Sequence, residues 1–534
     1  MPTVRQATID LLRAHGLTTW FGNPGSSELT LLEDFPEDFR YFLGLQEMVP
    51  VGMADAYAQL TGRPAIVNLH TAPGLGNAQG ALYNAFHNKT PLIVTAGNQR
   101  RDMQNQMSLL TNFDATNVPK PFVKWSAEPA TASEVPAVLA RAIHLANTPP
   151  RGPVFVSLPM DDMNTELTDE QAAKVDLVRD RTVTHAGGFP AELAAEIAGR
   201  IEAAHSPCLV VGADVERYGA RDAVVALAER TRSAVWTAPL TGLSGFPEDH
   251  PSYRGTLAPG AGWISQALAG HDLVIAIGTP VFRYYPKIAG PFLPDGASLI
   301  HLTNDPDEAA RAQFGDAIVT DVRAASEAIL AHVGQTVRDV PAPREPVADP
   351  GAVSTPLSPK ALWSAVGRAL PDDAVLVSEG GSNEFPIAEH VRPGSLLSHL
   401  SAAGGGLGFG LPAAVGAQLA VPDRPVVAAM GDGSMHYAIT ALWTAARHGI
   451  PVTVVVSSNA EYAVLKQFAG LEQASGVPGL DLPGLDIVAT ARSYGVDAHE
   501  ATSTGDVAEL LAAGVADRER PTLINVATTP PAGL

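Results

Sequence analysis

Residues 425–434 have the sequence PVVAAMGDGS, and residues 451–459 have the sequence PVTVVVSSN. Each stretch begins with an apolar run that is typical of a buried parallel strand and ends in polar residues. The carboxyl ends of neighbouring parallel strands are where open α/β sheets bind ligands. We therefore predict that Asp432 and Asn459 meet at one ligand site, with a helix over 438–448 between the two strands.

The two side chains suit a divalent metal ion that also holds phosphate groups. A carboxylate and an amide oxygen are hard ligands of the kind that Mg²⁺ or Ca²⁺ prefers. Gly431 and Gly433 would let the backbone approach a diphosphate, and a helix N-terminus favours its negative charge. The alternative is a βα turn without a ligand, because Gly-Asp-Gly is also a common turn signal.

The pairing of these two segments resembles the metal–diphosphate signature of thiamine diphosphate (ThDP) enzymes. The resemblance implies that the metal is held by Asp432, by Asn459 and by the backbone carbonyl of Glu461. It also implies that Ser434 contacts the diphosphate.

Composition limits the classes of partner. The net charge of −21 excludes a basic nucleic-acid-binding face and disfavours an anionic membrane surface. No apolar run is long enough to span a membrane, and residues 1–15 lack the basic start and apolar core of a signal peptide. The single cysteine, Cys208, begins an apolar run, which indicates an inert core thiol and fits a reducing cytoplasm.

The chain of 534 residues divides into three blocks in which apolar strands alternate with helices. This alternation predicts an α/β protein of three doubly wound parallel-sheet domains, over 1–180, 189–340 and 360–534. Residues 161–188 and 341–359 are polar and aperiodic, so we expect irregular linkers there. The middle block has no Gly-x-Gly-x-x-Gly motif after a strand and thus no evident dinucleotide fingerprint.

The expected elements follow from the same patterns. The expected strands are 19–22, 40–44, 64–69, 91–96 and 153–158, then 207–211, 234–237, 272–277 and 298–302, then 374–377, 425–430 and 451–456. The expected helices outside the middle block are 6–15, 27–34, 47–61, 360–370 and 438–448, and a glycine-rich turn is expected over 71–76.

Three residues of the first block lie where catalytic side chains of such sheets lie. Glu47 follows a strand directly; the alternative is a carboxylate that only caps the next helix. His70 ends a strand beside the glycine-rich turn, and its titration range suits proton transfer near neutral pH; the alternative is a hydrogen-bonded core histidine. Ser26 could hold a substrate carboxylate, whereas Ser26 or Ser27 could equally be a helix N-cap.

A set of longer stretches carries a specific resemblance: FGNPGSSEL, VNLH, LIVTAGNQ, LLTNFDATNVPKPFVKW, GHDLVIAIGTPVFRY and AAGGGLGFGLPAAVG. Together with GDGS they make the chain similar to the benzoylformate decarboxylases over nearly its full length. That family converts phenylglyoxylate to benzaldehyde and CO₂ as a ThDP- and Mg²⁺-dependent homotetramer. The resemblance implies a pyrimidine-binding, a middle and a diphosphate-binding domain. It also implies that ThDP lies between the first domain of one subunit and the third of another, so that a dimer is the minimum active unit.

The resemblance also assigns roles to single residues. The catalytic set is Glu47 as cofactor activator, Ser26 as binder of the substrate carboxylate, His70 as proton-transfer residue and Tyr285. The cofactor contacts are Glu47, Asn77, Gly405 through its carbonyl, Leu407 as the apolar wedge that bends ThDP, Gly431, Asp432, Gly433, Ser434, Asn459 and Tyr462. The substrate pocket is Ser26, His70, Leu109, Leu110, Ser401, Val464, Leu465 and Phe468, and Asn117 resembles a ligand of a second cation.

The chain departs from the family at informative places. Tyr285 stands where the family has a second active-site histidine, and a phenol is a much weaker acid than imidazolium near neutral pH. Ser401 replaces an aromatic residue of the family, and Val464 replaces an alanine. The alternatives are therefore a decarboxylase of another 2-oxo acid or an acetolactate-synthase-like carboligase that makes 2-hydroxy ketones. A non-catalytic protein of the same fold is a further alternative.

Overall fold

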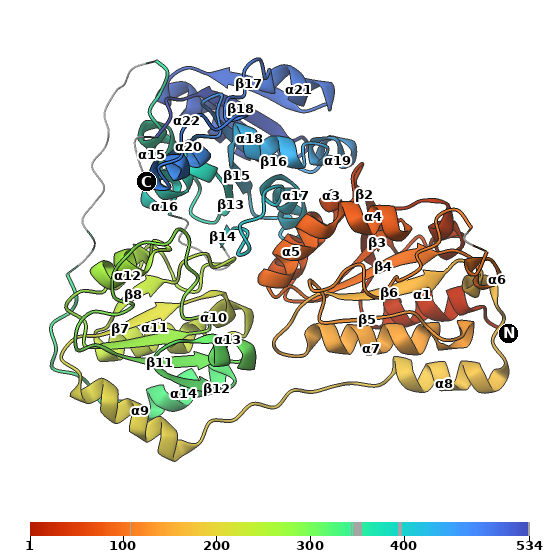
Figure 1. The fold of residues 1–534 in the computed structure, drawn as a ribbon, viewed down its shortest axis with the longest axis horizontal. Coiled ribbons are helices and arrows are strands. Elements are labelled where there is room, and N and C mark those ends of the chain that lie inside the picture. The colour runs from red at the N-terminus through yellow and green to blue at the C-terminus, as the bar shows by residue number, and fades with distance from the viewer. Residues whose placement is uncertain (107, 343, 345–354, 393–397, 532–534) are drawn as a thin grey trace.

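The computed structural model describes residues 1–106, 108–342, 344, 355–392 and 398–531. The chain forms three α/β domains, each built on a six-stranded sheet with helices packed on it (Figure 1). All pairings between the named strands are parallel. The predicted fold class is thus confirmed.

The first domain is drawn in red to orange in Figure 1. Its strands are β1 (Thr19–Asn23), β2 (Arg40–Leu43), β3 (Ala65–Leu69), β4 (Leu92–Asn98), β5 (Trp125–Ala127) and β6 (Val154–Pro159). Its helices are α1 (Val4–Ala14), α2 (Leu29–Leu32), α3 (Met48–Thr61), α4 (Thr71–Asn77), α5 (Gln79–His87), α6 (Arg101–Gln104), α7 (Val135–Asn147) and α8 (Asp169–Arg179), with 3₁₀ turns η1 (Ser26–Glu28), η2 (Ala132–Glu134) and η3 (Asp162–Asn164).

The middle domain follows a long irregular segment after α8 (Figure 1). Its strands are β7 (Pro207–Val211), β8 (Ala234–Thr237), β9 (Tyr253–Thr256), β10 (Leu273–Ile277), β11 (Ser298–Thr303) and β12 (Asp316–Val319). Its helices are α9 (Ala191–Ala203), α10 (Ala213–Arg217), α11 (Arg221–Thr231), α12 (Ala261–Ala267), α13 (Pro306–Arg311) and α14 (Val322–His332).

The third domain carries the segment from which the fold was predicted. Its strands are β13 (Val375–Glu379), β14 (His399–Leu400), β15 (Val426–Gly431), β16 (Val452–Ser458), β17 (Asp497–Ala501) and β18 (Thr522–Ala527). Its helices are α15 (Pro359–Ala369), α16 (Glu384–His390), α17 (Gly410–Ala420), α18 (Asp432–Tyr437), α19 (Ala441–His448), α20 (Ala463–Leu471), α21 (Ile487–Ser493) and α22 (Thr504–Ala516), with the 3₁₀ turn η4 (Gly381–Asn383).

The strand orders explain where the sites lie. The first sheet has the order β2-β1-β3-β4-β6-β5, and the third has β14-β13-β15-β16-β18-β17, so the two domains share one topology. The order reverses between β1 and β3 in one and between β13 and β15 in the other. Such switch points leave a crevice at the carboxyl ends of the strands. The middle sheet, β12-β11-β10-β7-β8-β9, switches between β7 and β10.

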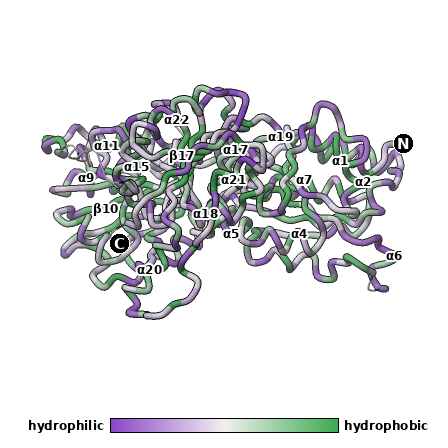
Figure 2. Tube along the Cα trace, turned by 90° about the horizontal axis from the view of Figure 1, so that it is seen from above, coloured by the Kyte–Doolittle hydropathy of each residue, from purple (hydrophilic) through white to green (hydrophobic). Residues whose placement is uncertain are grey.

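The first and third domains also share one hydrophobic core. Buried residues of α3 and of α17 belong to a single cluster that includes strand residues of both sheets. The two helices approach closely, because a Cβ on Gly416 would lie 1.9 Å from the carbonyl oxygen of Met53. In the view of Figure 2 the first domain lies on the right, and hydrophobic and hydrophilic segments alternate along the tube. No helix among the described residues is long and apolar enough to cross a membrane.

Several element predictions were wrong. The stretch 161–188 is not wholly irregular, because it contains η3 and α8, and Thr168 caps α8 in a capping box with Gln171. The glycine-rich turn over 71–76 is helical and forms α4. The helix predicted over 438–448 is α19, which begins only at Ala441, and a separate short helix that was not predicted, α18, precedes it from Asp432 to Tyr437. The helix over 27–34 is the turn η1 followed by the short α2. Most of the predicted linker 341–359 lies outside the described residues.

Candidate functional site

Asp432 and Asn459 meet at the carboxyl edge of the third sheet, as the sequence predicts. β15 pairs with β16, Gly431 lies opposite Ser457, and Asp432 begins α18. The Asp432 carboxylate is 5% exposed and accepts backbone N–H hydrogen bonds from Gly433 at 2.8 Å, Asn459 at 3.1 Å and Ala460 at 2.8 Å. Burial raises the pKa of Asp432, and these N–H groups oppose that rise.

The donor set at this edge fits a hard divalent cation. It comprises the Asp432 carboxylate, the Asn459 amide oxygen and the backbone carbonyls of the turn that follows, all of them oxygen ligands. The side-chain oxygen of Asn459 accepts the N–H of Glu461 at 3.1 Å, and the Glu461 carboxylate pairs with Lys466. No cluster of three His, Cys, Asp or Glu suited to a metal occurs in the described part of the chain, so a cation here would rely on one carboxylate and neutral oxygens.

The glycines beside Asp432 are closely approached by other parts of the third domain. A Cβ on Gly433 would lie 2.5 Å from the Tyr462 ring, and one on Gly431 would lie 3.2 Å from the carbonyl oxygen of Gly380. Ser434 follows in the first turn of α18 and is buried. The packing leaves little room for a side chain at either glycine, and the segment begins a helix, whose N-terminus favours negative charge.

Glu47 lies at the start of α3 without capping it. It is 9% exposed, and its side chain makes no capping hydrogen bond. Its carboxylate instead accepts a hydrogen bond of 3.0 Å from the amide of Asn77 at the end of α4. A Cβ on Gly74 would lie 3.0 Å from the same carboxylate. The interpretation as a helix cap is therefore wrong, and Glu47 and Asn77 form one polar pair.

His70 has a buried acidic partner that the sequence analysis missed. Nδ1 of His70 lies 2.9 Å from the carboxylate of Glu28 and 3.3 Å from the hydroxyl of Ser27. Glu28 is 1% exposed, and its carboxylate also accepts the N–H groups of Gly25 and Gly97, each at 2.7 Å. His70 directly follows β3 and lies beside a hydrogen-bonded carboxylate at the switch point of the first sheet. A proton-transfer residue and a hydrogen-bonded core histidine would both have such a partner.

Ser26 lies in the same crevice. It begins the turn η1 and is exposed, while Gly25 is the N-cap residue and no side chain caps the turn. The alternative in which Ser26 or Ser27 caps a helix is therefore wrong. Gly25 packs directly against His70, since a Cβ there would lie 2.1 Å from Nδ1. The Ser26 hydroxyl and the His70 ring thus belong to neighbouring strand ends.

The predicted pocket residues are gathered only in part. The Tyr285 ring lies 4.8 Å from the Phe468 ring, centroid to centroid, and is 61% exposed. Leu465 lies on α20 with Phe468 and is also exposed, and Val464 of the same helix is half-buried. The Ser401 hydroxyl donates to the carbonyl of Thr241 at 3.2 Å. These residues come from the middle and third domains, and the ring contact joins Tyr285 of the former to Phe468 of the latter.

The remaining predicted residues lie in the first domain and in the third-domain loop that carries Gly405 and Leu407. Leu109 is 84% exposed, and Leu110 has a positive φ of 66°. Asn117 is exposed, and its amide oxygen accepts from Lys120 at 3.0 Å. Gly405 is exposed with a φ of 72°, and Leu407 is half-buried two residues later.

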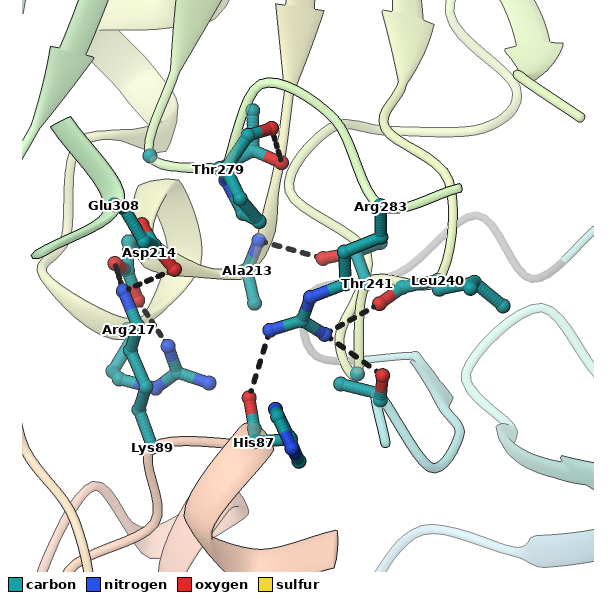
Figure 3. Close-up of a pocket in the computed structure, with 14 residues that line it drawn as sticks. His87, Lys89, Ala213, Asp214, Arg217, Leu240, Thr241, Thr279, Arg283 and Glu308 are labelled. Carbon is teal, nitrogen blue, oxygen red and sulfur yellow. Dashed lines mark hydrogen bonds and ion pairs between the residues drawn. The ribbon is translucent and has the colours of Figure 1, made fainter. Parts of the chain in front are cut away.

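A cavity at the junction of the three domains contains none of the predicted site residues (Figure 3). It lies at the switch point of the middle sheet and is lined by residues of all three domains. Lys89 of the first domain fills one side, with its ammonium 3.1 Å from Asp214, 3.2 Å from Asp305 and 2.9 Å from Glu308. Burial lowers the pKa of Lys89, but the three carboxylates together raise it by more, so that the net shift of this pKa is upward.

Comparisons with known proteins give the family. Three family models match: the N-terminal TPP binding domain of thiamine pyrophosphate enzymes over residues 2–118, their central domain over 194–329 and their C-terminal TPP binding domain over 379–526. Thiamine pyrophosphate is another name for ThDP.

Individual relatives narrow the comparison. The chain is 45% identical to a benzoylformate decarboxylase of Pseudomonas aeruginosa, over 99% of both chains. The solved structure of a ThDP-dependent 4-hydroxybenzoylformate decarboxylase of Rhodococcus jostii superposes with a TM-score of 0.95 at 43% identity, over 99% of both chains. A putative acetolactate synthase large subunit of Mycobacterium tuberculosis is more distant, at 29% identity over 98% of both chains.

Proposed function

Because the chain belongs to the thiamine pyrophosphate enzymes, among the benzoylformate decarboxylases, we propose that it decarboxylates an aromatic 2-oxo acid such as phenylglyoxylate to the aldehyde and CO₂. The observation that carries the proposal is the pair of polar switch-point sites. One presents Asp432 and Asn459 for a metal diphosphate, and the other presents Glu47, His70 and Ser26. The acetolactate synthase relative is less similar in sequence, at 29% identity, so carboligation is the second candidate function.

The residues at the third-domain edge would hold ThDP through its diphosphate and Mg²⁺. Asp432, Asn459 and the carbonyl of Glu461 are the proposed metal ligands, and Gly431, Gly433, Ser434 and Tyr462 would surround the diphosphate. The charge and type of these oxygens support Mg²⁺ or Ca²⁺. When bound, ThDP would supply an electron sink for the electron pair that stays behind when the carboxylate of the substrate leaves as CO₂.

The first-domain residues would handle protons and the substrate carboxylate. Glu47, oriented by Asn77, would hold the proton shared with the pyrimidine ring nitrogen of the cofactor. The Ser26 hydroxyl would donate to the substrate carboxylate. His70, with Nδ1 occupied by Glu28, would exchange a proton at Nε2. Each role requires the side chain to stay in one orientation, which the hydrogen bonds of Glu47 and His70 support.

The apolar residues would bind the aromatic ring and exclude water. Tyr285 and Phe468 present two packed rings, which suit an aryl substrate through face and edge contacts. Leu109, Leu110, Val464 and Leu465 would complete the wall of the substrate pocket, and Ser401 leaves room beside it. Tyr285 supplies an aromatic surface where relatives supply an imidazole, so we assign it to ring binding first and to proton transfer second.

We further propose the assembly that completes the site. Domains 1–180, 189–340 and 360–534 would be the pyrimidine-binding, middle and diphosphate-binding domains. Glu47 and Asp432 would serve one ThDP from two subunits, which makes a homodimer the minimum active unit and supports a tetramer. The cytoplasm and a second cation at Asn117 stay predictions.

The test is reconstitution of the apo-protein. After dialysis against chelator, ThDP and Mg²⁺ should together restore CO₂ release from phenylglyoxylate and para-substituted analogues, with equimolar aldehyde. A 2-hydroxy ketone as the main product would favour the carboligase alternative. Lack of CO₂ release from every 2-oxo acid tested, despite bound cofactor, would contradict the proposal.

A further inference from the structure

Two asparagines, Asn84 of α5 and Asn88 at its C-terminal cap, hold the backbone of the loop 403–406. The side-chain amide of Asn84 donates to the carbonyl of Gly406 at 2.8 Å, and its oxygen accepts the N–H of Gly406 at 3.1 Å. One turn further along the chain, the side-chain oxygen of Asn88 accepts the N–H of Ala403 at 2.9 Å. The spacing of four residues places both side chains on the same side of this segment. The first domain therefore holds both ends of a third-domain loop by hydrogen bonds.

The glycines of this loop show how closely it is gripped. A Cβ on Gly404 would lie 2.7 Å from the Tyr83 ring, and one on Gly406 would lie 2.8 Å from the side-chain oxygen of Asn84. Gly405, between them, differs from both. It has a left-handed φ of 72°, it is exposed, and a Cβ there would have no other atom within 4 Å. The loop is therefore fixed at its ends and presents its middle peptide to open space.

Asn84 and Asn88, which we call the asparagine clamp, are supported by further contacts at Asn88 and at Ala403. Asn88 is 1% exposed, and its amide donates to the buried carboxylate of Asp55 at 3.0 Å. Arg283 of the middle domain donates to the carbonyl of Ala403 at 2.9 Å and to that of His87 at 3.2 Å, as Figure 3 shows for the end of α5. Ala403 is thus bonded through its N–H to the first domain and through its carbonyl to the middle domain.

We propose that Asn84 and Asn88 are positioning residues that set the direction of the Gly405 carbonyl and so orient the aminopyrimidine of ThDP. The proposal rests on the proposed function, in which Gly405 contacts the cofactor. The side-chain amide of Asn84 bonds both the N–H and the C=O of Gly406. The Gly406 N–H belongs to the same planar peptide unit as the Gly405 carbonyl, so this contact fixes the orientation of that unit. Without it, the left-handed Gly405 would rotate freely, because glycine populates both signs of φ.

The asparagine clamp is also close in sequence to the residue that bonds Glu47. Asn77, which bonds the Glu47 carboxylate, ends α4, and α5 begins at Gln79. One continuous stretch of the first domain therefore orients Glu47 at its start and the loop 403–406 further along. A displacement of α5 would disturb both groups together.

The test uses the full-length protein with Asn84→Ala and Asn84→Asp. Alanine removes both hydrogen bonds, and aspartate keeps the acceptor but sets a carboxylate against the Gly406 carbonyl. Asn147→Asp makes the same chemical change on α7, where the amide donates only within its own helix at 3.3 Å, and is the matched control. The readouts are ThDP affinity by titration of apo-protein, the C2–H exchange rate of bound ThDP, and amide hydrogen exchange at Gly406.

We expect Asn84→Ala to lose amide protection at Gly406 and to bind ThDP about tenfold more weakly, as two lost hydrogen bonds imply. We expect Asn84→Asp to weaken ThDP binding by a similar factor, because it loses one hydrogen bond and its carboxylate repels the Gly406 carbonyl. We expect C2–H exchange at saturating ThDP to slow by a similar factor in both, while Asn147→Asp matches the wild type. A variant that melts at lower temperature but exchanges C2–H at the wild-type rate would show a merely structural role and overturn the proposal. Wild-type protein that neither binds ThDP nor exchanges C2–H would instead contradict the proposed function.

Discussion

The carboxylate of Glu28 lies 2.9 Å from Nδ1 of His70 and is almost completely buried. Glu28 also accepts two backbone N–H groups, so its position is fixed by the fold independently of the histidine. With Nδ1 bonded to this carboxylate, Nε2 is the ring nitrogen left to exchange a proton. The pair has the arrangement of a catalytic base and the carboxylate that orients it.

Glu28→Gln should lower kcat with little change in ThDP affinity. The amide cannot accept from Nδ1 as strongly as a carboxylate, so the histidine loses its fixed orientation, and a loss of about 10²-fold is expected for a disturbed acid–base group. The exposed Glu37→Gln is the control. Wild-type kcat in Glu28→Gln would show that His70 needs no partner.

Glu47→Gln should bind ThDP but slow the exchange of its C2 proton. Glutamine keeps the shape and the contact with Asn77 but cannot carry the proton, and acid–base groups contribute about 10²–10⁴-fold. The exchange of the C2 proton is allowed to proceed in deuterated buffer, is stopped by quenching at set times, and is followed by NMR. An unchanged exchange rate would mean that Glu47 does not activate the cofactor.

Asp432→Ala should lose ThDP and activity together. The substitution removes the one carboxylate of the predicted metal site, and dialysis against chelator followed by ThDP and Mg²⁺ should not restore binding in the variant. Binding is followed by calorimetric titration. Asp423→Ala, on an exposed turn before the same strand, should behave as the wild type. Full activity of Asp432→Ala would exclude this residue as a metal ligand.

Tyr285→Phe and Tyr285→His separate two roles of the side chain at that position. If Tyr285 binds the aryl ring, phenylalanine should leave KM and kcat for phenylglyoxylate nearly unchanged. Histidine should raise the rate of aldehyde release, because imidazolium donates protons near neutral pH far better than a phenol. Loss of turnover in Tyr285→Phe would show that the phenol itself transfers the proton.

The strands and the meeting of Asp432 with Asn459 at one sheet edge were predictable because their signals are local. The apolar runs before Asp432 and Asn459 and the polar residues that end them lie within each segment, and parallel pairing brings them together. α8 was also predictable, since Thr168 and Gln171 form a capping box, and that signal was overlooked. Short strands such as β5 and β14 carry too few residues for a periodic pattern.

The partners of the site could not be predicted, because they are distant in sequence. Glu28 and His70 are separated by 42 residues, and nothing near Glu28 indicates a buried carboxylate. Asn84 and Gly406 are separated by 322 residues, so their contact depends on the packing of α3 against α17. Chain segments of this kind meet only once the domain arrangement is known.

The central claim is that Glu47 of one subunit and Asp432 of another act on one ThDP. It is tested most directly by co-expressing Glu47→Gln and Asp432→Ala chains with different affinity tags and assaying the doubly purified mixed assembly. In a mixed dimer one site would keep both Glu47 and Asp432, and the other would lose both. We predict decarboxylation of phenylglyoxylate far above that of either parent variant. A mixed assembly no more active than the parents would contradict the claim.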